Sequence, residues 1–168
     1  MKIYVIVVTY KGMRWYDKCF SSLRESTLPV HTIVVDNTPG DDDAIYIKSK
    51  FPEIHLIKTE ENLGFGKANN IGMRYALDQG CDYVFLLNQD AWIMPNTIEK
   101  MVNTMQLYPE YGIISPVQCN KELTQVHNGV IDFLAYPDHT SYTLFSDLIL
   151  DTVKDIYSVK EVNAAAWL

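Results

Sequence analysis

The sequence predicts a single α/β domain whose mainly parallel sheet is covered by helices on both faces. Over roughly the first 120 residues, short β-branched runs alternate with segments of helical periodicity. Such alternation favours parallel strands joined by right-handed helical crossovers. The chain has 168 residues, 48% of them hydrophobic, which is enough for one domain with its own core.

The first strand is predicted over residues 3–8, a β-branched run (IYVIVV). A helix should follow, because Trp15, Cys19 and Leu23 recur at helical spacing. Pro29 breaks this pattern and ends the segment.

The second strand is predicted over residues 32–35, and the sequence DNTPG that follows it is typical of a turn. Asp41 is a candidate N-cap for a short helix over residues 42–50. Residues 54–57 form the third predicted strand, a short one.

The third helix is predicted from about Gly66 to Gly80, because apolar residues recur on one face of this segment. The fourth strand covers residues 83–87. Residues 96–99 (NTIE) then have the form of a capping box that opens a fourth helix, and Pro109 closes that helix.

A fifth strand is predicted over residues 112–115, after which the periodicity weakens. Residues 127–150 are rich in aromatic and turn residues, and we expect loops and short strands there, with a hairpin around Asn128 and Gly129. The whole pattern predicts a Rossmann-like α/β layer followed by a less regular segment.

Composition excludes several classes of protein. The chain carries 14 basic and 21 acidic residues, a net charge of −7, without a Lys/Arg-rich run, so a nucleic-acid partner is not expected. The three cysteines are widely spaced and form no CxxC pair, which favours reduced thiols over a metal site. No apolar run approaches the ~20 residues of a transmembrane segment, and residues 1–8 do not form a signal peptide. We expect a cytoplasmic protein, and peripheral association with the inner face of a membrane is compatible with this composition.

Polar side chains follow the first, second and fourth predicted strands at the point where each strand ends. They are Thr9 and Tyr10, Asp36 and Asn37, and Asn88, Gln89 and Asp90. The carboxyl ends of parallel strands meet at one edge of a sheet, where open α/β sheets bind their ligands. We therefore expect these side chains to converge in one crevice.

Two carboxylates at this edge are candidate ligand groups. Ionised Asp36 can accept hydrogen bonds from a nucleobase or a ribose hydroxyl, and the alternative role is a turn-forming Asx residue before Pro39. Asp90 ends an apolar strand and suits a divalent cation with the phosphates it carries, and the alternative is a turn carboxylate ahead of Pro95. The residues alone leave both alternatives open.

Residues 62–70 (NLGFGKANN) are the second candidate site. Gly64 and Gly66 let the backbone approach a ligand, and the N-terminus of the following helix favours anions. The segment is not a dinucleotide fingerprint, because Asn69 occupies the position of the third glycine. Lys67 is either a phosphate partner or a solvated surface charge.

Together these motifs resemble family-2 inverting glycosyltransferases of the GT-A fold. The residues that carry the resemblance are VVTY at 7–10, VVDN at 34–37, NLGFGKANNIG at 62–72 and LLNQD at 86–90. The resemblance covers roughly the first 120 residues and is greatest to rhamnosyltransferase-like members that build bacterial surface polysaccharides. It implies the inverting transfer of a hexose or deoxyhexose from a UDP- or dTDP-linked donor to a glycan or lipid-linked acceptor.

The resemblance also implies roles for parts of the chain. Residues 1–120 would form the nucleotide-binding half, and residues 121–168 the start of the acceptor-side half. Asp36 would bind the pyrimidine base, and Asp90 would hold Mg²⁺ or Mn²⁺ on the donor diphosphate. The residues that would contact the donor are Thr9, Tyr10, Asp36, Asn62, Gly64, Lys67, Asn70 and Asn88.

Two features depart from the family pattern. Asn88 stands where many relatives have an aspartate, which leaves one charge of the metal uncompensated. The catalytic base of the family follows a Gly/Ala-rich strand, here predicted over residues 162–168, so we expect the base beyond Leu168. We accordingly expect a fragment of a longer protein, whose terminal strand has an unpaired edge that favours self-association. The acids that precede the expected position, and to which no role is assigned, are Asp132, Asp138, Asp147, Asp151 and Asp155.

Two other functions remain alternatives. A sugar nucleotidyltransferase also combines a Rossmann-like sheet with a metal-bound nucleotide, but residues 9–12 lack the glycine-rich basic loop that embraces a triphosphate. A binding module that keeps the nucleotide pocket without a catalytic base is the second. A serine hydrolase and a P-loop NTPase are excluded, because the sequence has neither a GxSxG elbow nor a GxxxxGK[ST] loop.

Overall fold

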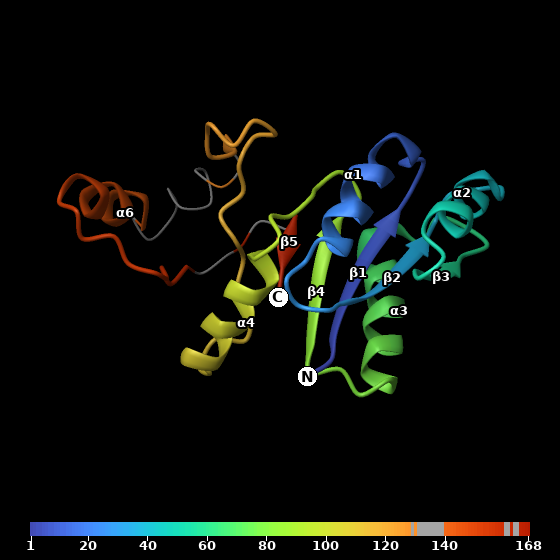
Figure 1. Cartoon of the computed structure of the whole chain (residues 1–168), viewed down its shortest axis with the longest axis horizontal. Coiled ribbons are helices and arrows are strands. Elements are labelled where there is room, and N and C mark those ends of the chain that lie inside the picture. Colours follow the sequence, from blue (N-terminus) through green and yellow to red (C-terminus); the bar gives the residue numbers. More distant parts are fainter. Residues whose placement is uncertain (129, 131–139, 160–161, 163–164) are drawn as a thin grey trace.

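The computed structural model describes residues 1–128, 130, 140–159, 162 and 165–168. A five-stranded sheet forms its centre, in the order β3-β2-β1-β4-β5 (Figure 1). The strands are β1 (Ile3–Thr9), β2 (His31–Asp36), β3 (His55–Lys58), β4 (Tyr83–Asn88) and β5 (Ala166–Trp167). The first four are parallel, and β5 runs antiparallel to β4. The predicted mainly parallel sheet is confirmed.

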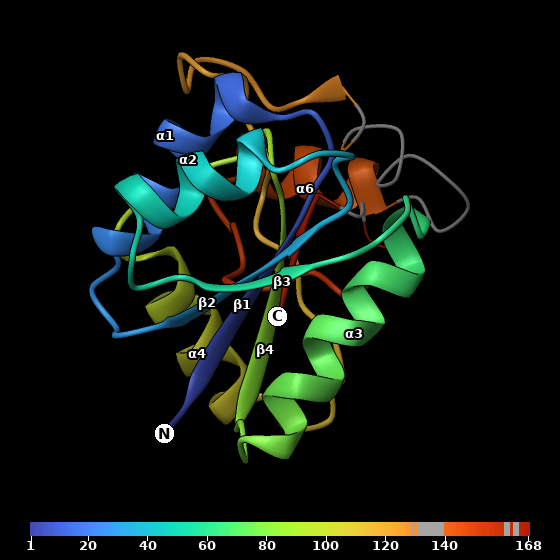
Figure 2. The ribbon, with the colours of Figure 1, turned by 90° about the vertical axis from the view of Figure 1, so that its right-hand side faces the viewer.

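Helices cover both faces of this sheet (Figure 2). They are α1 (Met13–Arg24), α2 (Asp42–Lys50), α3 (Gly64–Asp78) and α4 (Thr97–Leu107). The further helix α6 (Thr140–Ile149) lies away from the sheet (Figure 1). One buried cluster joins a face of the sheet to α1, α2 and α4, and a second cluster joins the opposite face to α3. Because both faces of the strands are buried, the strands have continuous apolar runs in the sequence.

α3 packs closely on the sheet at Gly72. A Cβ atom at this position would lie 2.5 Å from Ile6 Cγ2, so a larger residue would push the helix away from the strand. The N-terminus of α3 lies beside the carboxyl ends of the strands, and Gly64 there adopts a φ of +75°. In the part of the chain that the structure describes, no helix is long and apolar enough to cross a membrane.

Two predictions for the second half of the chain are wrong. Residues 112–115 do not form a regular strand; Ile114 exchanges backbone hydrogen bonds with Leu168 (3.0 and 2.9 Å), and Pro116, which has no N–H, cannot continue a ladder. Residues 140–149 form α6 instead of loops and short strands. Several apolar side chains of α6 are exposed, among them Tyr142, Phe145 and Leu148, so its apolar residues do not mark a buried face as those of the earlier helices do.

Of the strand predicted over residues 162–168, residues 163 and 164 lie outside the described part of the chain, and the described residues form only the two-residue strand β5. Its outer edge is partly covered by the pairing of Leu168 with Ile114, so self-association through this edge stays a prediction. The hairpin expected at Asn128 and Gly129 cannot be compared with the structure, because Gly129 lies outside the described part of the chain. Asp132 and Asp138 also lie outside it.

The capping predictions are also wrong, although the helices begin where expected. Neither Asp41 nor Asn96 makes a side-chain capping hydrogen bond. Both have ψ near zero, whereas a capping side chain normally needs an extended backbone. The carboxylate of Glu99 accepts a hydrogen bond from Thr27 Oγ1 (2.7 Å) instead of completing a capping box.

Candidate functional site

A cavity of about 320 Å³ opens at the carboxyl ends of β1, β2 and β4. We call it the strand-end pocket. Its lining residues are Val8, Tyr10, Asn37, Asn62, Gly64, Phe65, Asn88, Gln89 and Asp90. They come from three strand ends and from the start of α3. Of the seven strand-end residues expected to converge, five line this pocket: Tyr10, Asn37, Asn88, Gln89 and Asp90.

The pocket contains some of the predicted donor-contacting residues and excludes others. Those that line it are Tyr10, Asn62, Gly64, Asn88 and Asp90. Thr9 and Asp36 are buried and are not among its lining residues. Lys67 and Asn70 are exposed on α3, outside the lining.

Four lining residues were not proposed as site residues from the sequence. Asn37 and Gln89 lie within motifs that were recognised, and their polar side chains at strand ends were the available signal. Val8 pairs with Asn88 in the parallel register of β1 and β4, a pairing that only the folded sheet provides. Phe65 is 44% exposed and forms part of the wall beside Gly64.

A larger cavity, of about 590 Å³, lies between α4 and the segments 111–118 and 155–159. Its charged lining residues are Lys100 and Asp155. It is lined neither by the strand ends nor by the motif residues. The smaller strand-end pocket is therefore the candidate functional site.

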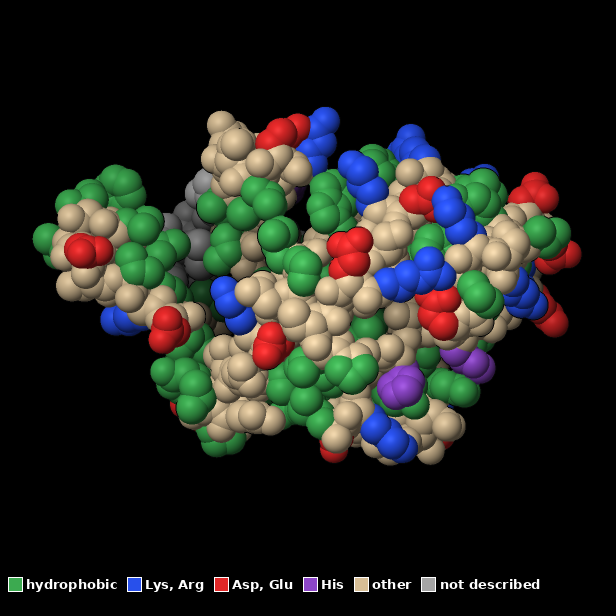
Figure 3. Space-filling view, in the orientation of Figure 1, with side chains coloured by type: hydrophobic (Ala, Val, Ile, Leu, Met, Phe, Trp, Pro, Cys, Tyr) green, Lys and Arg blue, Asp and Glu red, His purple; other side chains and the backbone are tan. Residues whose placement is uncertain are grey.

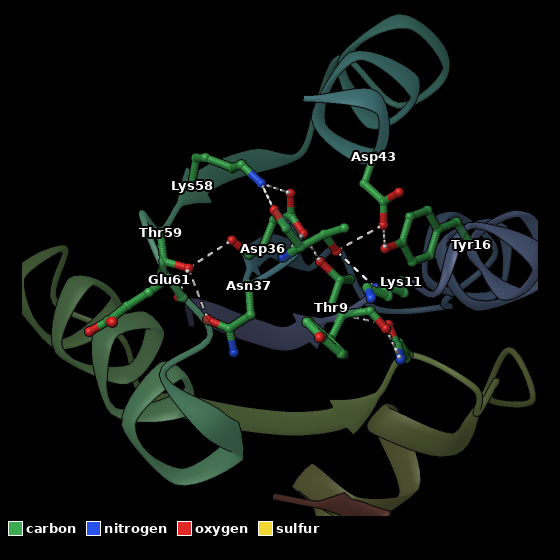
Figure 4. A network of polar contacts seen from close by, with 12 residues as sticks. Thr9, Lys11, Tyr16, Asp36, Asn37, Asp43, Lys58, Thr59 and Glu61 are labelled. Atoms are coloured by element: carbon green, nitrogen blue, oxygen red, sulfur yellow. Dashed lines mark hydrogen bonds and ion pairs between the residues drawn. The ribbon is translucent and has the colours of Figure 1, made fainter. Parts of the chain in front are cut away.

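Asp36 is fully buried beside the pocket, and its carboxylate is held by three donors (Figure 4). Oδ1 accepts hydrogen bonds from Thr9 Oγ1 (3.0 Å) and from the backbone N–H of Thr38 (2.9 Å). Oδ2 accepts one from Lys58 Nζ (2.9 Å). The bond to Thr38 is the local contact of an Asx turn, so Asp36 fixes the turn that follows β2.

A polar network extends from this carboxylate toward α1 and α2. Thr38 Oγ1 donates to the buried carboxylate of Asp43 (3.0 Å) and accepts from the backbone N–H of Lys11 (2.9 Å). Tyr16 donates to the same carboxylate of Asp43 (2.5 Å). Burial and the neighbouring Asp43 carboxylate raise the pKa of the Tyr16 hydroxyl well above its usual range. The network therefore ties the loop after β1 to the loop after β2.

Gln89 fixes the position of Tyr10 at the rim of the pocket. Its Oε1 accepts a hydrogen bond from the Tyr10 N–H (2.9 Å), and its Nε2 donates to the Tyr10 carbonyl (3.2 Å). This two-point contact needs a glycine at position 12, because a Cβ atom on Gly12 would lie 2.0 Å from Gln89 Oε1.

The N-terminus of α3 forms another wall of the pocket. Asn62 Oδ1 accepts a hydrogen bond from the Gly64 N–H (2.9 Å), and Asn37 Nδ2 donates to the Gly64 carbonyl (3.5 Å). Thr59 holds Asn37 through a hydrogen bond to its Oδ1 (3.0 Å). The first backbone N–H groups of a helix have no intrahelical partner, and here they lie beside the cavity, an arrangement that suits an anion.

The sequence pattern of glycosyl transferase family 2 matches residues 4–147. This range includes every residue that lines the strand-end pocket. The chain belongs to glycosyl transferase family 2.

This family-2 chain is similar to longer proteins. It is 32% identical over 103 residues to the dTDP-rhamnosyl transferase RfbF of Shigella flexneri, a match that covers 59% of the chain and 33% of the relative. Among the curated relatives it matches, the chain spans between a third and a half of their length.

Two solved structures share its fold. S. aureus TarS 1-349 in complex with UDP-GlcNAc has a TM-score of 0.57 and 23% identity, covering 65% of this chain and 32% of TarS. The mannosyltransferase PcManGT of Pyrobaculum calidifontis, in complex with GDP-Man and Mn²⁺, has a TM-score of 0.61 and 21% identity, covering 73% of this chain and 37% of that protein. The GT-A fold expected from the sequence is confirmed.

The oxygen atoms in the pocket of this family-2 chain fit a cation that arrives with a phosphate ligand. Asp90 is exposed to the pocket, and Asn88 Oδ1 is buried without a hydrogen-bond partner. Among the described residues, no three His, Cys, Asp or Glu side chains are grouped so that they could hold a metal alone. A hard divalent ion such as Mg²⁺ commonly takes one or two protein oxygens and completes its shell with phosphate and water.

Proposed function

We propose that this family-2 chain is the donor-binding part of a glycosyltransferase. The whole protein would transfer a hexose or deoxyhexose from a UDP- or dTDP-linked donor to a glycan or lipid-linked acceptor, with inversion, in bacterial surface polysaccharide synthesis. The observation that carries the proposal is the strand-end pocket, which combines amide side chains, one carboxylate and a helix N-terminus. The similarity to a dTDP-rhamnosyl transferase and the shared fold with a UDP-GlcNAc complex support it.

The charge of the pocket supports a metal-bound diphosphate. The pocket has one carboxylate, Asp90, and none of its lining side chains is basic, so a diphosphate would meet no protein cation inside it. A divalent cation held by Asp90 and the Asn88 amide oxygen would offset the negative charge of the Asp90 carboxylate and of the diphosphate. When bound, such an ion supplies stabilisation of the charge that develops on the departing nucleoside diphosphate.

The chain's own residues would position the donor. Tyr10, whose backbone is held by Gln89, and Asn37, whose side chain is held by Thr59, would contact the nucleoside. Asp36 shapes the same wall through its bonds to Thr9 and to the turn after β2. The α3 N-terminus would bind phosphate oxygens, with Lys67 and Asn70 flanking them from the surface.

None of the carboxylates in the described part of residues 121–168 is assigned as the catalytic base. The Asp147 carboxylate accepts hydrogen bonds from Tyr157 (2.9 Å) and Thr152 (3.2 Å), which gives it a structural role. Asp151 and Asp155 are exposed and lie outside the strand-end pocket. A proton acceptor for the attacking hydroxyl is still required by the chemistry, and we expect it outside residues 1–168.

Titration calorimetry on the 168-residue chain tests donor binding. UDP and dTDP should bind at least tenfold more tightly with Mn²⁺ than with EDTA, a difference of about 1.4 kcal/mol. Asp90→Asn should remove this metal dependence. Asp78→Asn, an exposed carboxylate at the opposite end of α3, is the matched control and should retain it. The absence of nucleotide binding with either Mg²⁺ or Mn²⁺ would refute the proposal.

Product analysis with the whole protein separates the alternatives. Sugar transfer from UDP- or dTDP-sugar supports a glycosyltransferase. Pyrophosphate release from a nucleoside triphosphate and a sugar phosphate would indicate a nucleotidyltransferase instead. Nucleotide binding without either reaction would indicate a binding module.

A further inference from the structure

Three basic side chains stack on aromatic rings along the start of α1. Lys11 Nζ lies 5.3 Å from the ring centroid of Tyr10, and the Arg14 guanidinium lies 4.8 Å from that of Trp15. Lys18 Nζ lies 4.9 Å from the ring centroid of Trp92. We call these residues the α1 basic-aromatic surface; they are Tyr10, Lys11, Arg14, Trp15, Lys18 and Trp92.

The three cations of this surface are exposed and have no carboxylate partner among the described residues. Asp17 lies on the same helix, but its carboxylate is already engaged by Lys50 Nζ (2.5 Å) and by Tyr46 (2.6 Å). Lys and Arg side chains gather over α1 next to hydrophobic ones (Figure 3). In a chain whose net charge is −7, this is a local excess of positive charge.

The proposed donor site does not use these charges. None of the three cations lines the strand-end pocket. The surface nevertheless borders the pocket, because Tyr10 belongs to both and Trp92 follows the lining residue Asp90 by two positions. A partner bound to the surface would therefore lie beside the pocket without filling it.

We propose that the α1 basic-aromatic surface binds the surface of an anionic lipid bilayer. Its cations complement the negative potential of such a membrane, which attracts Lys and Arg within a Debye length. Tyr and Trp rings combine an apolar body with a polar edge and are favoured at the membrane interface. Met13, 37% exposed, adds apolar area from the same helix.

Lipid explains this composition better than nucleic acid does. Tracking a phosphate backbone needs many cations along a groove, whereas the surface offers three on a strongly acidic chain. The bilayer also accounts for the neighbouring exposed Tyr10 and Met13 and the half-buried Trp15 and Trp92, which a polyanion in water would not need.

Vesicle flotation with the 168-residue chain tests the proposal. Vesicles of equal parts phosphatidylcholine and phosphatidylglycerol should bind the chain at least tenfold more strongly than pure phosphatidylcholine vesicles, and added salt should weaken the binding. Each basic residue near an anionic surface strengthens binding about fivefold. The triple variant Lys11→Gln, Arg14→Gln and Lys18→Gln should therefore lose roughly 100-fold.

A charge-matched control separates a local surface from net charge. Lys48→Gln, Arg74→Gln and Lys100→Gln remove the same charge from exposed side chains on α2, α3 and α4. This control should bind within about threefold of the parent. Equal losses in the two triple variants, or equal binding to both kinds of vesicle, overturn the proposal, as does binding to heparin without binding to vesicles.

Quenching by brominated lipid gives a readout that does not depend on the charge variants. Trp15 and Trp92 belong to the proposed contact, and the third tryptophan, Trp167, packs against the sheet. Brominated anionic vesicles should quench the fluorescence of the parent chain, and quenching should fall in the double variant Trp15→Phe and Trp92→Phe. Unquenched fluorescence of vesicle-bound protein would contradict an interfacial position for these rings.

Discussion

Replacing Lys58 with methionine should destabilise the fold by leaving a buried carboxylate without its cation. Lys58 stands opposite Asp36 in the parallel register of β2 and β3, and its ammonium group lies 2.9 Å from Asp36 Oδ2. The same group donates to the Thr38 carbonyl. Methionine keeps most of the length and the apolar stem of the side chain but removes both hydrogen bonds.

The magnitude follows from the burial of the two partners. Removing one member of a buried ion pair costs about 3–5 kcal/mol, because the other charge is left unpaired. Asp36 is fully buried, but the Lys58 side chain is 30% exposed, so water can partly replace the ammonium group. We therefore expect a loss of about 2–4 kcal/mol in the free energy of unfolding.

Urea denaturation followed by circular dichroism measures this loss. With an m value of about 2 kcal/mol/M, the midpoint should fall by about 1–2 M. Lys48→Met is the control, at an exposed lysine that forms no ion pair with the residues that the structure describes, and it should change stability by less than about 0.5 kcal/mol. Combining Lys58→Met with Asp36→Asn should recover about 1–2 kcal/mol relative to the sum of the single changes. If Lys58→Met costs no more than the control, the reasoning about the buried carboxylate is wrong.

Two further predictions concern the pocket wall and its network. Gly12→Ala should displace the Gln89 side chain, because its Cβ would lie 2.0 Å from Oε1; the loss of two hydrogen bonds to Tyr10 should cost about 1–2 kcal/mol in urea denaturation and weaken UDP binding in calorimetry. Gly66→Ala, which meets no atom within 4 Å, is the control for added bulk. Tyr16 has a raised pKa in the folded state, so the unfolded state should release the Tyr16 proton first as pH rises above about 10. Stability should then fall with pH by up to about 1.4 kcal/mol per pH unit. This part of the slope should disappear in Tyr16→Phe, and an unchanged slope between pH 9.5 and 11 would contradict the assignment.

The regular half of the fold could be predicted because its signals are local. The β-branched runs and the helical periodicity up to Pro109 reflect elements with defined buried faces, and the structure confirms four strands and four helices there. The sequence did not predict α6, because many of its apolar side chains are exposed and do not define one buried face of a helix. The capping predictions failed because Asp41 and Asn96 have ψ angles near zero, and the residue type alone does not determine the backbone conformation that capping needs.

The site could be predicted in outline. Strand ends that carry Tyr10, Asn88 and Asp90 must meet at one edge if the sheet is parallel, and these residues do line one cavity. The partners of the buried groups could not be found this way. Lys58 and Asp36 are separated by 22 residues and Gln89 and Tyr10 by 79, and each pair depends on strand register or on the path of a loop.

The sequence by itself therefore determined the family, the alternation of strands and helices, and the edge of the sheet at which polar groups collect, because these follow from periodicity and from motifs in order along the chain. Only the tertiary structure decided which of these polar groups line the strand-end pocket and which are buried against each other. Asp36 has the sequence context of a ligand-binding carboxylate, yet in the folded chain its oxygens are taken up by Thr9, Thr38 and Lys58. Buried polar groups must find partners within the fold, and those partners come from distant segments that the sheet brings together.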